Sequence, residues 1–289
     1  MRWLAAFAAL ALMTDVIHAA EPVRLELPGI EHAFDLGGGV FSGGSPVGDA
    51  AFAELARRGV KTIVSVDGAR PDVAAARRAG LRYVHLPIGY DGIPAAQAAA
   101  LATLAATLPG GIFLHCHHGR HRGPAAAAIV CAVRDGWTAE RGEAWLRVAG
   151  TSADYAGLDR SVREFQPPTA DALKQIPADF PEIAPTPPVV DAMVAIDEHC
   201  DALRAAQSRG WSDPPDAAAA ALWEHFRELT RAETDAKLRL LFSAAEQAAA
   251  GFRDALQTAG NAAQRDAAWK RVTASCTDCH REQRNARAR

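Results

Sequence analysis

The distribution of apolar and polar positions predicts two kinds of structure along the chain. Before about residue 166, short apolar runs such as 63–66 and 111–114 alternate with alanine-rich stretches, which is the pattern of buried strands separated by helices. Beyond residue 188, helical periodicity extends over the stretches 189–208, 216–230, 232–256 and 262–284. We therefore predict an α/β domain over residues 21–166, with a central sheet flanked by helices, and an all-α four-helix bundle over residues 189–289.

Proline marks the boundary between the two predicted domains. Residues 167–188 contain seven prolines, which excludes interior helix or central strand there and predicts a semi-stiff linker. The chain has 289 residues, of which 49% are hydrophobic, so it is long enough to build a core in each part. Its formal net charge of −3 gives no bulk basic surface, and we do not expect a nucleic-acid partner.

The first twenty residues predict export. A basic Arg2 precedes an apolar run over residues 4–13, and Ala19 and Ala20 are small residues of the kind found before a cleavage site, so residues 1–20 are predicted to be a signal peptide. A membrane anchor would need about 20 apolar residues, and Thr14 and Asp15 interrupt this run too early. We expect a periplasmic protein without a membrane span after cleavage.

One short segment predicts the chemistry of the first domain. Residues 115–123 read His-Cys-His-His-Gly-Arg-His-Arg-Gly, between the predicted strand 111–114 and a predicted helix over 124–133. The N–H groups and dipole at a helix N-terminus favour a phosphate and also a thiolate. In this position Cys116 is the candidate nucleophile, and Arg122 is the candidate bidentate ligand of the phosphoryl oxygens.

A general acid is also required. Asp91 is the candidate, because it lies in a turn after a short apolar strand and before a predicted helix over 95–108. The alternative for Asp91 is an ordinary turn aspartate before Gly92, with Asp67 as the reserve candidate for the acid.

With these motifs, residues of roughly 35 to 165 resemble the cysteine-dependent dual-specificity phosphatases, whose loop has the form HCxxGxxR. The resemblance implies Cys116 as nucleophile, Arg122 as phosphate ligand and Asp91 as acid. It departs from the family at Gly123, where the family usually has Ser or Thr to help the thiolate leave. The resemblance also implies that the phosphate-binding loop includes His117, His118, Gly119, Arg120 and His121.

The basic residues of this loop resemble those of atypical phosphatases that act on inositol phosphates. Phosphotyrosine, phosphoserine and a small polyphosphate therefore all stay open as substrates. The histidines could alternatively form a metal site, which is disfavoured because a loop that wraps a phosphate splays alternate side chains outward.

A second motif predicts a covalent haem. Cys276, Cys279 and His280 form C-x-x-C-H, which allows two thioether bonds and places the imidazole on the iron. A redox dithiol would need a βαβ context, and the surroundings here are helical. The motif and the bundle resemble the cytochrome c prime and c-556 group, which implies haem c, His280 as proximal ligand, a redox partner or a small gas ligand, and a homodimer.

The other face of the iron has two candidate ligands. Met193 lies on the first helix of the bundle, where six-coordinate members of that group have a methionine ligand. The alternative is that Met193 is an ordinary core residue. His199 is the weaker rival, and without either the iron is five-coordinate. Arginines near the end of the chain form either a solvated helix end or a docking site for an acidic redox partner: Arg281, Arg284, Arg287 and Arg289.

Three cysteines remain outside the haem motif, Cys116, Cys131 and Cys200. Cys131 lies about 12 Å along the predicted helix from the loop, too far for a disulfide with Cys116, and is expected to be a buried apolar residue. An exported, free Cys116 is then open to oxidation.

These inferences together predict an exported haem-containing phosphatase that acts on a phosphorylated protein or a small phosphorylated substrate. The alternative is an electron-transfer c-type cytochrome that carries an inert phosphate-binding module, for which Gly123 is the main argument.

Overall fold

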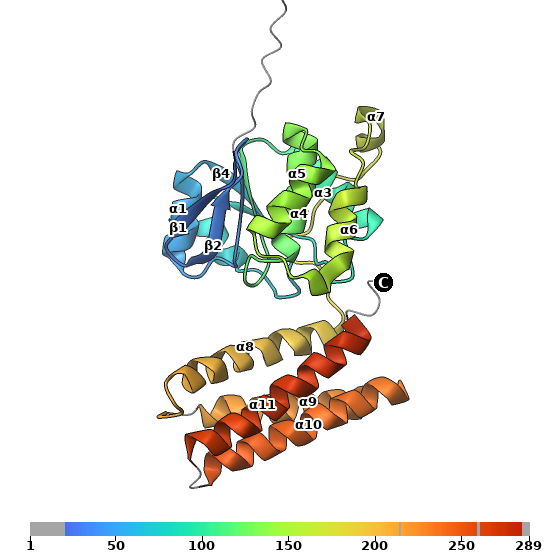
Figure 1. Cartoon of the computed structure of the whole chain (residues 1–289). Coiled ribbons are helices and arrows are strands. Elements are labelled where there is room, and N and C mark those ends of the chain that lie inside the picture. The colour runs from blue at the N-terminus through green and yellow to red at the C-terminus, as the bar shows by residue number, and fades with distance from the viewer. Residues whose placement is uncertain (1–20, 214, 259–260, 285–289) are drawn as a thin grey trace, which may run out of the picture.

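The computed structural model describes residues 21–284, apart from residue 214 and residues 259–260. The predicted signal peptide and the last arginines, Arg287 and Arg289, lie outside the described residues. An α/β part built around a sheet is followed by a part made of long helices (Figure 1).

The sheet of the described residues is mixed and has the strand order β1-β2-β3-β6-β4-β5. The first three strands pair antiparallel, while β3, β6, β4 and β5 are parallel. Strand β6 is central, and its last residue His115 is in register with Gly43 of β3 and Ser65 of β4. The strands are β1 (Val23–Leu27), β2 (Ile30–Asp35), β3 (Val40–Gly43), β4 (Val60–Ser65), β5 (Arg82–His85) and β6 (Gly111–His115).

Helices cover both faces of this sheet (Figure 1). Ile112 and Leu114 of β6 pack into one apolar cluster with α3 to α6, whereas Phe113 packs into the opposite cluster with α1 and α2. Burial on both faces explains why this strand is continuously apolar. The predicted α/β fold is confirmed, with α1 (Asp49–Arg57), α2 (Val73–Arg78), α3 (Ala95–Thr107), α4 (Arg122–Asp135), α5 (Ala139–Val148), the 3-10 turn η1 (Ala153–Tyr155) and α6 (Ala156–Glu164).

The proline-rich segment contacts the α/β part instead of simply spacing the two parts. It contains the short helix α7 (Ala170–Leu173), and its Phe180 is buried in the core cluster of α3 to α6. The carbonyl of Pro181 accepts a hydrogen bond from the N–H of His85, and the Ala184 N–H donates to His85 Nδ1. Because β5 is an edge strand, its N–H groups need such partners. The predicted domain boundaries themselves stay a prediction.

Four long helices form the second part, as the periodicity predicted. They are α8 (Pro188–Ser208), α9 (Asp216–Ala232), α10 (Ala236–Gln257) and α11 (Ala262–Cys279), and the chain continues as a π-helix, η2 (His280–Arg284). Their core contains Trp211, Phe252 and Trp269, whose rings pack against one another. A helical bundle is therefore present, while its assignment to a cytochrome group stays a prediction.

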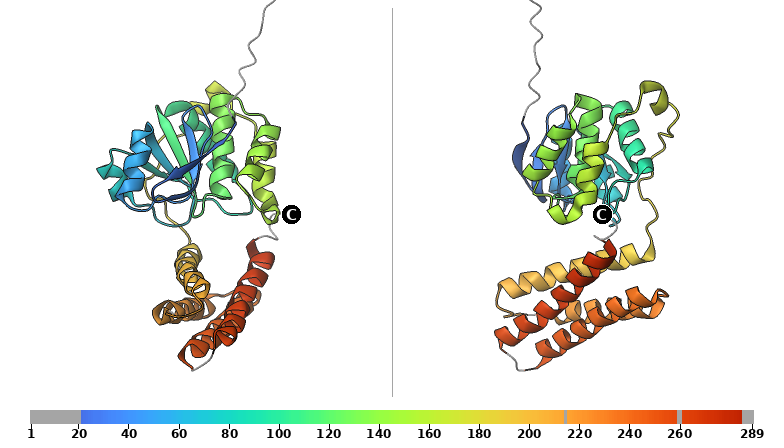
Figure 2. Two further views of the ribbon diagram at one scale, coloured as in Figure 1. Left: turned by 60° about the vertical axis from the view of Figure 1, so that its left-hand side comes forward. Right: turned by 45° about the vertical axis from the view of Figure 1, so that its right-hand side comes forward.

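Helix α8 and the C-terminal end of α11 lie on the side of the bundle nearest the α/β part (Figures 1 and 2). The packing thus brings the beginning of α8 close to Gly68, which follows β4, and Arg284 of η2 close to Tyr90, which follows β5. Among the described helices, none combines the length and the apolar character that crossing a bilayer requires.

Candidate active site

The Cys-x5-Arg loop connects the end of β6 to the start of α4. Cys116 directly follows β6 and is buried, and Arg122 is the first residue of α4 and only 8% exposed. His121 at the N-cap makes no side-chain capping bond. The first N–H groups of α4 therefore have no cap from that side chain, and they lie at the loop that carries the thiol.

Neighbouring loops hold this loop in place. Gly119 has a φ of +70°, and a Cβ there would overlap the backbone of Gly43 and Gly44, so only glycine fits. The Ser45 N–H donates to the His117 carbonyl at 2.9 Å. The segment that follows β3 thus shapes the loop, although the two lie more than 70 residues apart in sequence.

Arg122 is fixed by a buried ion pair with Asp67. Its Nη2 lies 3.0 Å from Asp67 Oδ1, and the two side chains are about 10% and 8% exposed. Burial raises the pKa of Asp67, but the charge of Arg122 and the smaller effects of His115, His117 and the Gly68 N–H together outweigh it. The pKa of Asp67 therefore lies below its ordinary value. Asp67, the reserve candidate for the acid, therefore acts here as the partner that positions Arg122.

The guanidinium retains one buried donor for a ligand. Arg122 Nε is buried and has no hydrogen-bond partner within the described residues. An unpaired buried donor is costly unless an acceptor approaches it. A phosphoryl oxygen held by the adjacent loop would supply that acceptor.

His115 supports the loop from the interior. Its Nδ1 lies 3.3 Å from the Cys116 carbonyl oxygen, which can only accept, so Nδ1 carries the proton and Nε2 accepts from the Tyr83 hydroxyl at 2.7 Å. Complete burial lowers the pKa of His115, so the ring is neutral. This pairing fixes the backbone at the nucleophile without adding charge.

The predicted positive charge of the loop needs one correction. The ring of His121 packs 4.7 Å from the ring of Tyr155, and burial together with Arg122 and Arg284 lowers the pKa of His121 to about 4. His121 is therefore neutral at pH 7 and does not add to the charge around an anion. Arg120 and His118 are exposed at the surface of the loop.

Asp91 lies beside the site, next to Tyr90. The Arg122 guanidinium lies 4.4 Å from the centre of the Tyr90 ring, so the segment carrying Asp91 is held against the loop arginine. Asp91 itself is exposed and its Oδ1 lies back beside Gly89. The ion-pair partner of Arg122 is Asp67, while the Asp91 carboxylate lies over its own turn.

Gly123, the residue after the loop arginine, is closely packed. A Cβ added there would lie 3.0 Å from the Cys116 nitrogen and 3.2 Å from the His115 carbonyl carbon. These distances are shorter than ordinary contacts of a Cβ, so the backbone would have to shift. The loop and α4 therefore approach each other closely at Gly123.

Cys131, the other cysteine of this part, is fully buried in α4, and burial raises the pKa of its thiol.

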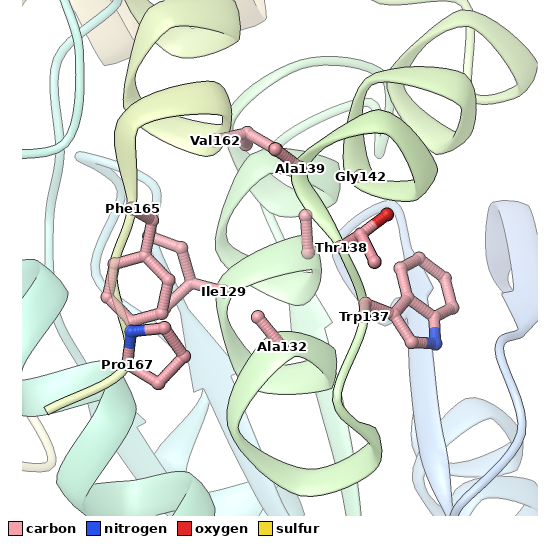
Figure 3. Close-up of a pocket in the computed structure, with 10 residues that line it drawn as sticks. Ile129, Ala132, Trp137, Thr138, Ala139, Gly142, Val162, Phe165 and Pro167 are labelled. Atoms are coloured by element: carbon pink, nitrogen blue, oxygen red, sulfur yellow. The ribbon is translucent and has the colours of Figure 1, made fainter. Parts of the chain in front are cut away.

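A separate pocket also lies along α4, with Phe165 and Pro167 on one side and Trp137 on the other (Figure 3). None of the residues 115–122 lines it, so this pocket is separate from the site of Cys116.

The residues of the haem motif fit covalent haem attachment. Cys276, Cys279 and His280 have the i, i+3, i+4 spacing that places side chains on one face of a helix, at the end of α11 and the start of η2. Both thiols are free within the described structure. Burial and Arg284 lower the pKa of His280 to about 4, which leaves the neutral imidazole that an iron ligand must be.

The two candidate distal ligands have different surroundings. Met193 of α8 packs against the same apolar cluster as Cys276. His199 instead stacks on His225 of α9, with ring centroids 5.4 Å apart. Ligation by Met193 stays a prediction, and His199 has a partner in the protein.

Two contacts that the sequence did not predict bring the helical part onto the loop. His117 Nε2 lies 3.2 Å from Asp201 Oδ2 of α8. Arg284 of η2 donates from Nη2 to the Tyr155 hydroxyl at 3.0 Å and lies 4.4 Å from the centre of the Tyr90 ring. The spacing of these residues along the chain carries no signal that could have found them.

Comparisons with known proteins found neither a matching family model nor a matching curated protein. Among solved structures, TpbA from P. aeruginosa is 24% identical, covers 52% of this chain and 92% of its own, and has a TM-score of 0.43. A cysteine-to-serine variant of TpbA in complex with phosphotyrosine is 22% identical, covers 53% of this chain and 93% of its own, and has a TM-score of 0.43. Human DUSP28 is 19% identical, covers 50% of this chain and 97% of its own, and has a TM-score of 0.37.

Proposed function

We propose that this protein is an exported, haem-containing, cysteine-dependent phosphatase. The observation that carries the phosphatase activity is the position of Arg122, which is fixed on Asp67 and keeps a buried Nε donor beside the loop of Cys116. A nucleophile, a bidentate cation and helix N-terminal amides in one loop are the groups that attack on a phosphate monoester requires.

The reaction has two displacements. Cys116 Sγ attacks the phosphorus, the bond to the ester oxygen breaks, and Asp91 protonates the leaving oxygen. Asp91 then removes a proton from water, the water oxygen attacks the phosphorus, and the S–P bond breaks to release phosphate and the thiolate. Arg122 binds the equatorial oxygens in both steps. A phosphorylated tyrosine, a phosphorylated serine or a small polyphosphate provides such a group.

The haem part of the proposal rests on the C-x-x-C-H face described above. When bound, the haem supplies electron transfer or the binding of a small gas. The chain itself supplies Cys276 and Cys279 for attachment and the neutral imidazole of His280, with Met193 as candidate second ligand. The contacts of Asp201 and Arg284 with the loop region give this part a physical route to the phosphatase site.

Hydrolysis of p-nitrophenyl phosphate tests the enzymatic proposal. We expect activity in the wild type and none in Cys116→Ser, while Cys131→Ala, which removes the other thiol of the same part, stays active. An inactive wild type that still binds phosphate would support the alternative, an electron-transfer cytochrome with an inert module.

Absorption spectra test the haem proposal. We expect a c-type haem that stays attached after denaturation and is lost from Cys276→Ser/Cys279→Ser. Phosphatase rates measured on the ferric, ferrous and carbon-monoxide-bound forms test the coupling, and identical rates in all three would contradict it.

A further inference from the structure

Three potential metal ligands meet where the phosphate-binding loop faces the helical part. Ligand atoms of His117, His118 and Asp197 all lie within 4.8 Å of one another. The histidines belong to the loop that follows Cys116, and Asp197 belongs to α8. We propose that these three residues bind a late first-row divalent cation, such as Zn²⁺, between the loop and α8.

The chemistry of the three side chains suits this ion. Two imidazoles and a carboxylate form the borderline nitrogen and oxygen set that such cations prefer, with ligand distances of about 2.0–2.2 Å. His118 is exposed and the other two side chains are half-buried, so all three are free enough to rotate toward one ion. The ring centroids of His117 and His118 are already only 4.2 Å apart.

Asp201 supports the same assignment. Its Oδ2 lies 3.2 Å from His117 Nε2 and accepts a hydrogen bond there, so the lone pair of the neutral ring is on Nδ1. Histidine ligands of metals commonly donate their other N–H to a carboxylate in this way, which fixes the ring. Arg204 lies 2.5 Å from Asp201 Oδ1 and 3.8 Å from Asp197 Oδ1, and so balances part of the charge of both carboxylates.

The ion would connect two parts of the chain that otherwise touch through few polar contacts. Because His117 and His118 directly follow the nucleophile, an ion held by them and Asp197 fixes the loop against α8. Bound Zn²⁺ therefore reduces access of substrate to Cys116 and inhibits the phosphatase. This inhibitory effect rests on the proposed function, whereas the binding of the ion does not.

Titration calorimetry of the full-length protein with Zn²⁺, after removal of bound metal by a chelator, tests the site. We expect one equivalent to bind, and at least about tenfold weaker binding in His118→Ala and in Asp197→Asn. Glu198→Gln is the matched control, since Glu198 is the exposed neighbour of Asp197 on α8, and its affinity is expected to equal that of the wild type.

The thiols of the haem motif are a competing metal site, so the titration is repeated in Cys276→Ser/Cys279→Ser. We expect binding to persist there. Binding that disappears with the two thiols, or that is unaffected in both His118→Ala and Asp197→Asn, would overturn the proposal. Phosphatase assays with added Zn²⁺ then separate the two claims: an inactive enzyme with intact Zn²⁺ binding contradicts only the proposed function, while activity without Zn²⁺ binding contradicts only the metal site.

Discussion

Arg284, near the end of the described chain, lies over the ring of Tyr90 at 4.4 Å from its centre, and the guanidinium of Arg122 lies at the same distance from that ring. One aromatic side chain thus contacts both the loop arginine and a residue contributed by the helical part. The segment that directly follows the haem motif therefore reaches a side chain of the proposed phosphatase site.

Replacing Arg284 by Ala is expected to open the site. The variant loses a cation–π contact and a hydrogen bond to Tyr155, together worth about 1–2 kcal/mol. We expect kcat/KM for a phosphotyrosine peptide to rise about three- to tenfold, with a smaller rise for p-nitrophenyl phosphate. Arg281→Ala is the control, because Arg281 of η2 pairs with the nearby Asp278 at the end of α11. Equal or lower rates in Arg284→Ala would show that this contact does not limit access.

Replacing Asp67 by Asn is expected to destabilise the α/β part. The variant leaves Arg122 buried without its ionic partner, a change that costs about 3–5 kcal/mol. Because the pKa of Asp67 is lowered by folding, its contribution to stability is complete above the unfolded pKa of about 4 and is lost as the pH falls through the lower folded value. Thermal unfolding should therefore show a large difference between wild type and Asp67→Asn at pH 7, and a difference that shrinks below about pH 4.

Asp91→Asn tests the general acid. A positioned acid contributes about 10²–10⁴-fold to rate, mostly for leaving groups that need a proton. We expect a loss of this size with phenyl phosphate and a much smaller loss with p-nitrophenyl phosphate, whose leaving group is stable as an anion. Equal losses with the two substrates would indicate that Asp91 shapes the turn and does not transfer the proton.

Gly123 bears on the second displacement. Without a hydroxyl after the loop arginine, hydrolysis of the phosphocysteine is expected to be slow, so rapid mixing of wild type with p-nitrophenyl phosphate should give a burst of about one equivalent of product. Gly123→Ser should lower kcat/KM, because its Cβ would crowd the Cys116 nitrogen. Gly123→Ala carries the same Cβ without the hydroxyl and separates crowding from chemistry. A Gly123→Ser variant faster than wild type would contradict this account.

Local pattern was sufficient for the elements and the motifs. The strand, loop and helix around Cys116 follow from an apolar run, a fixed spacing and an alanine-rich stretch, and the observed elements end within a few residues of their predicted limits. Periodicity predicted the helices of the bundle equally well, but it did not predict the change to a π-helix at His280. Such features depend on residues within one turn or one strand of each other.

Contacts between distant segments were decided only by the tertiary structure. Arg122 pairs with Asp67, a residue 55 positions away, because β4 and β6 are neighbours in the sheet and both end beside the loop. His121 loses its expected charge because Tyr155 and its surroundings bury it. From the sequence, a metal site at the histidines after Cys116 was the disfavoured alternative, and it gained a third candidate ligand only because the fold places Asp197 of α8 beside them. The sequence by itself determined which chemical groups the chain carries, and packing, which sums many weak contacts between segments far apart in the chain, determined which of those groups meet.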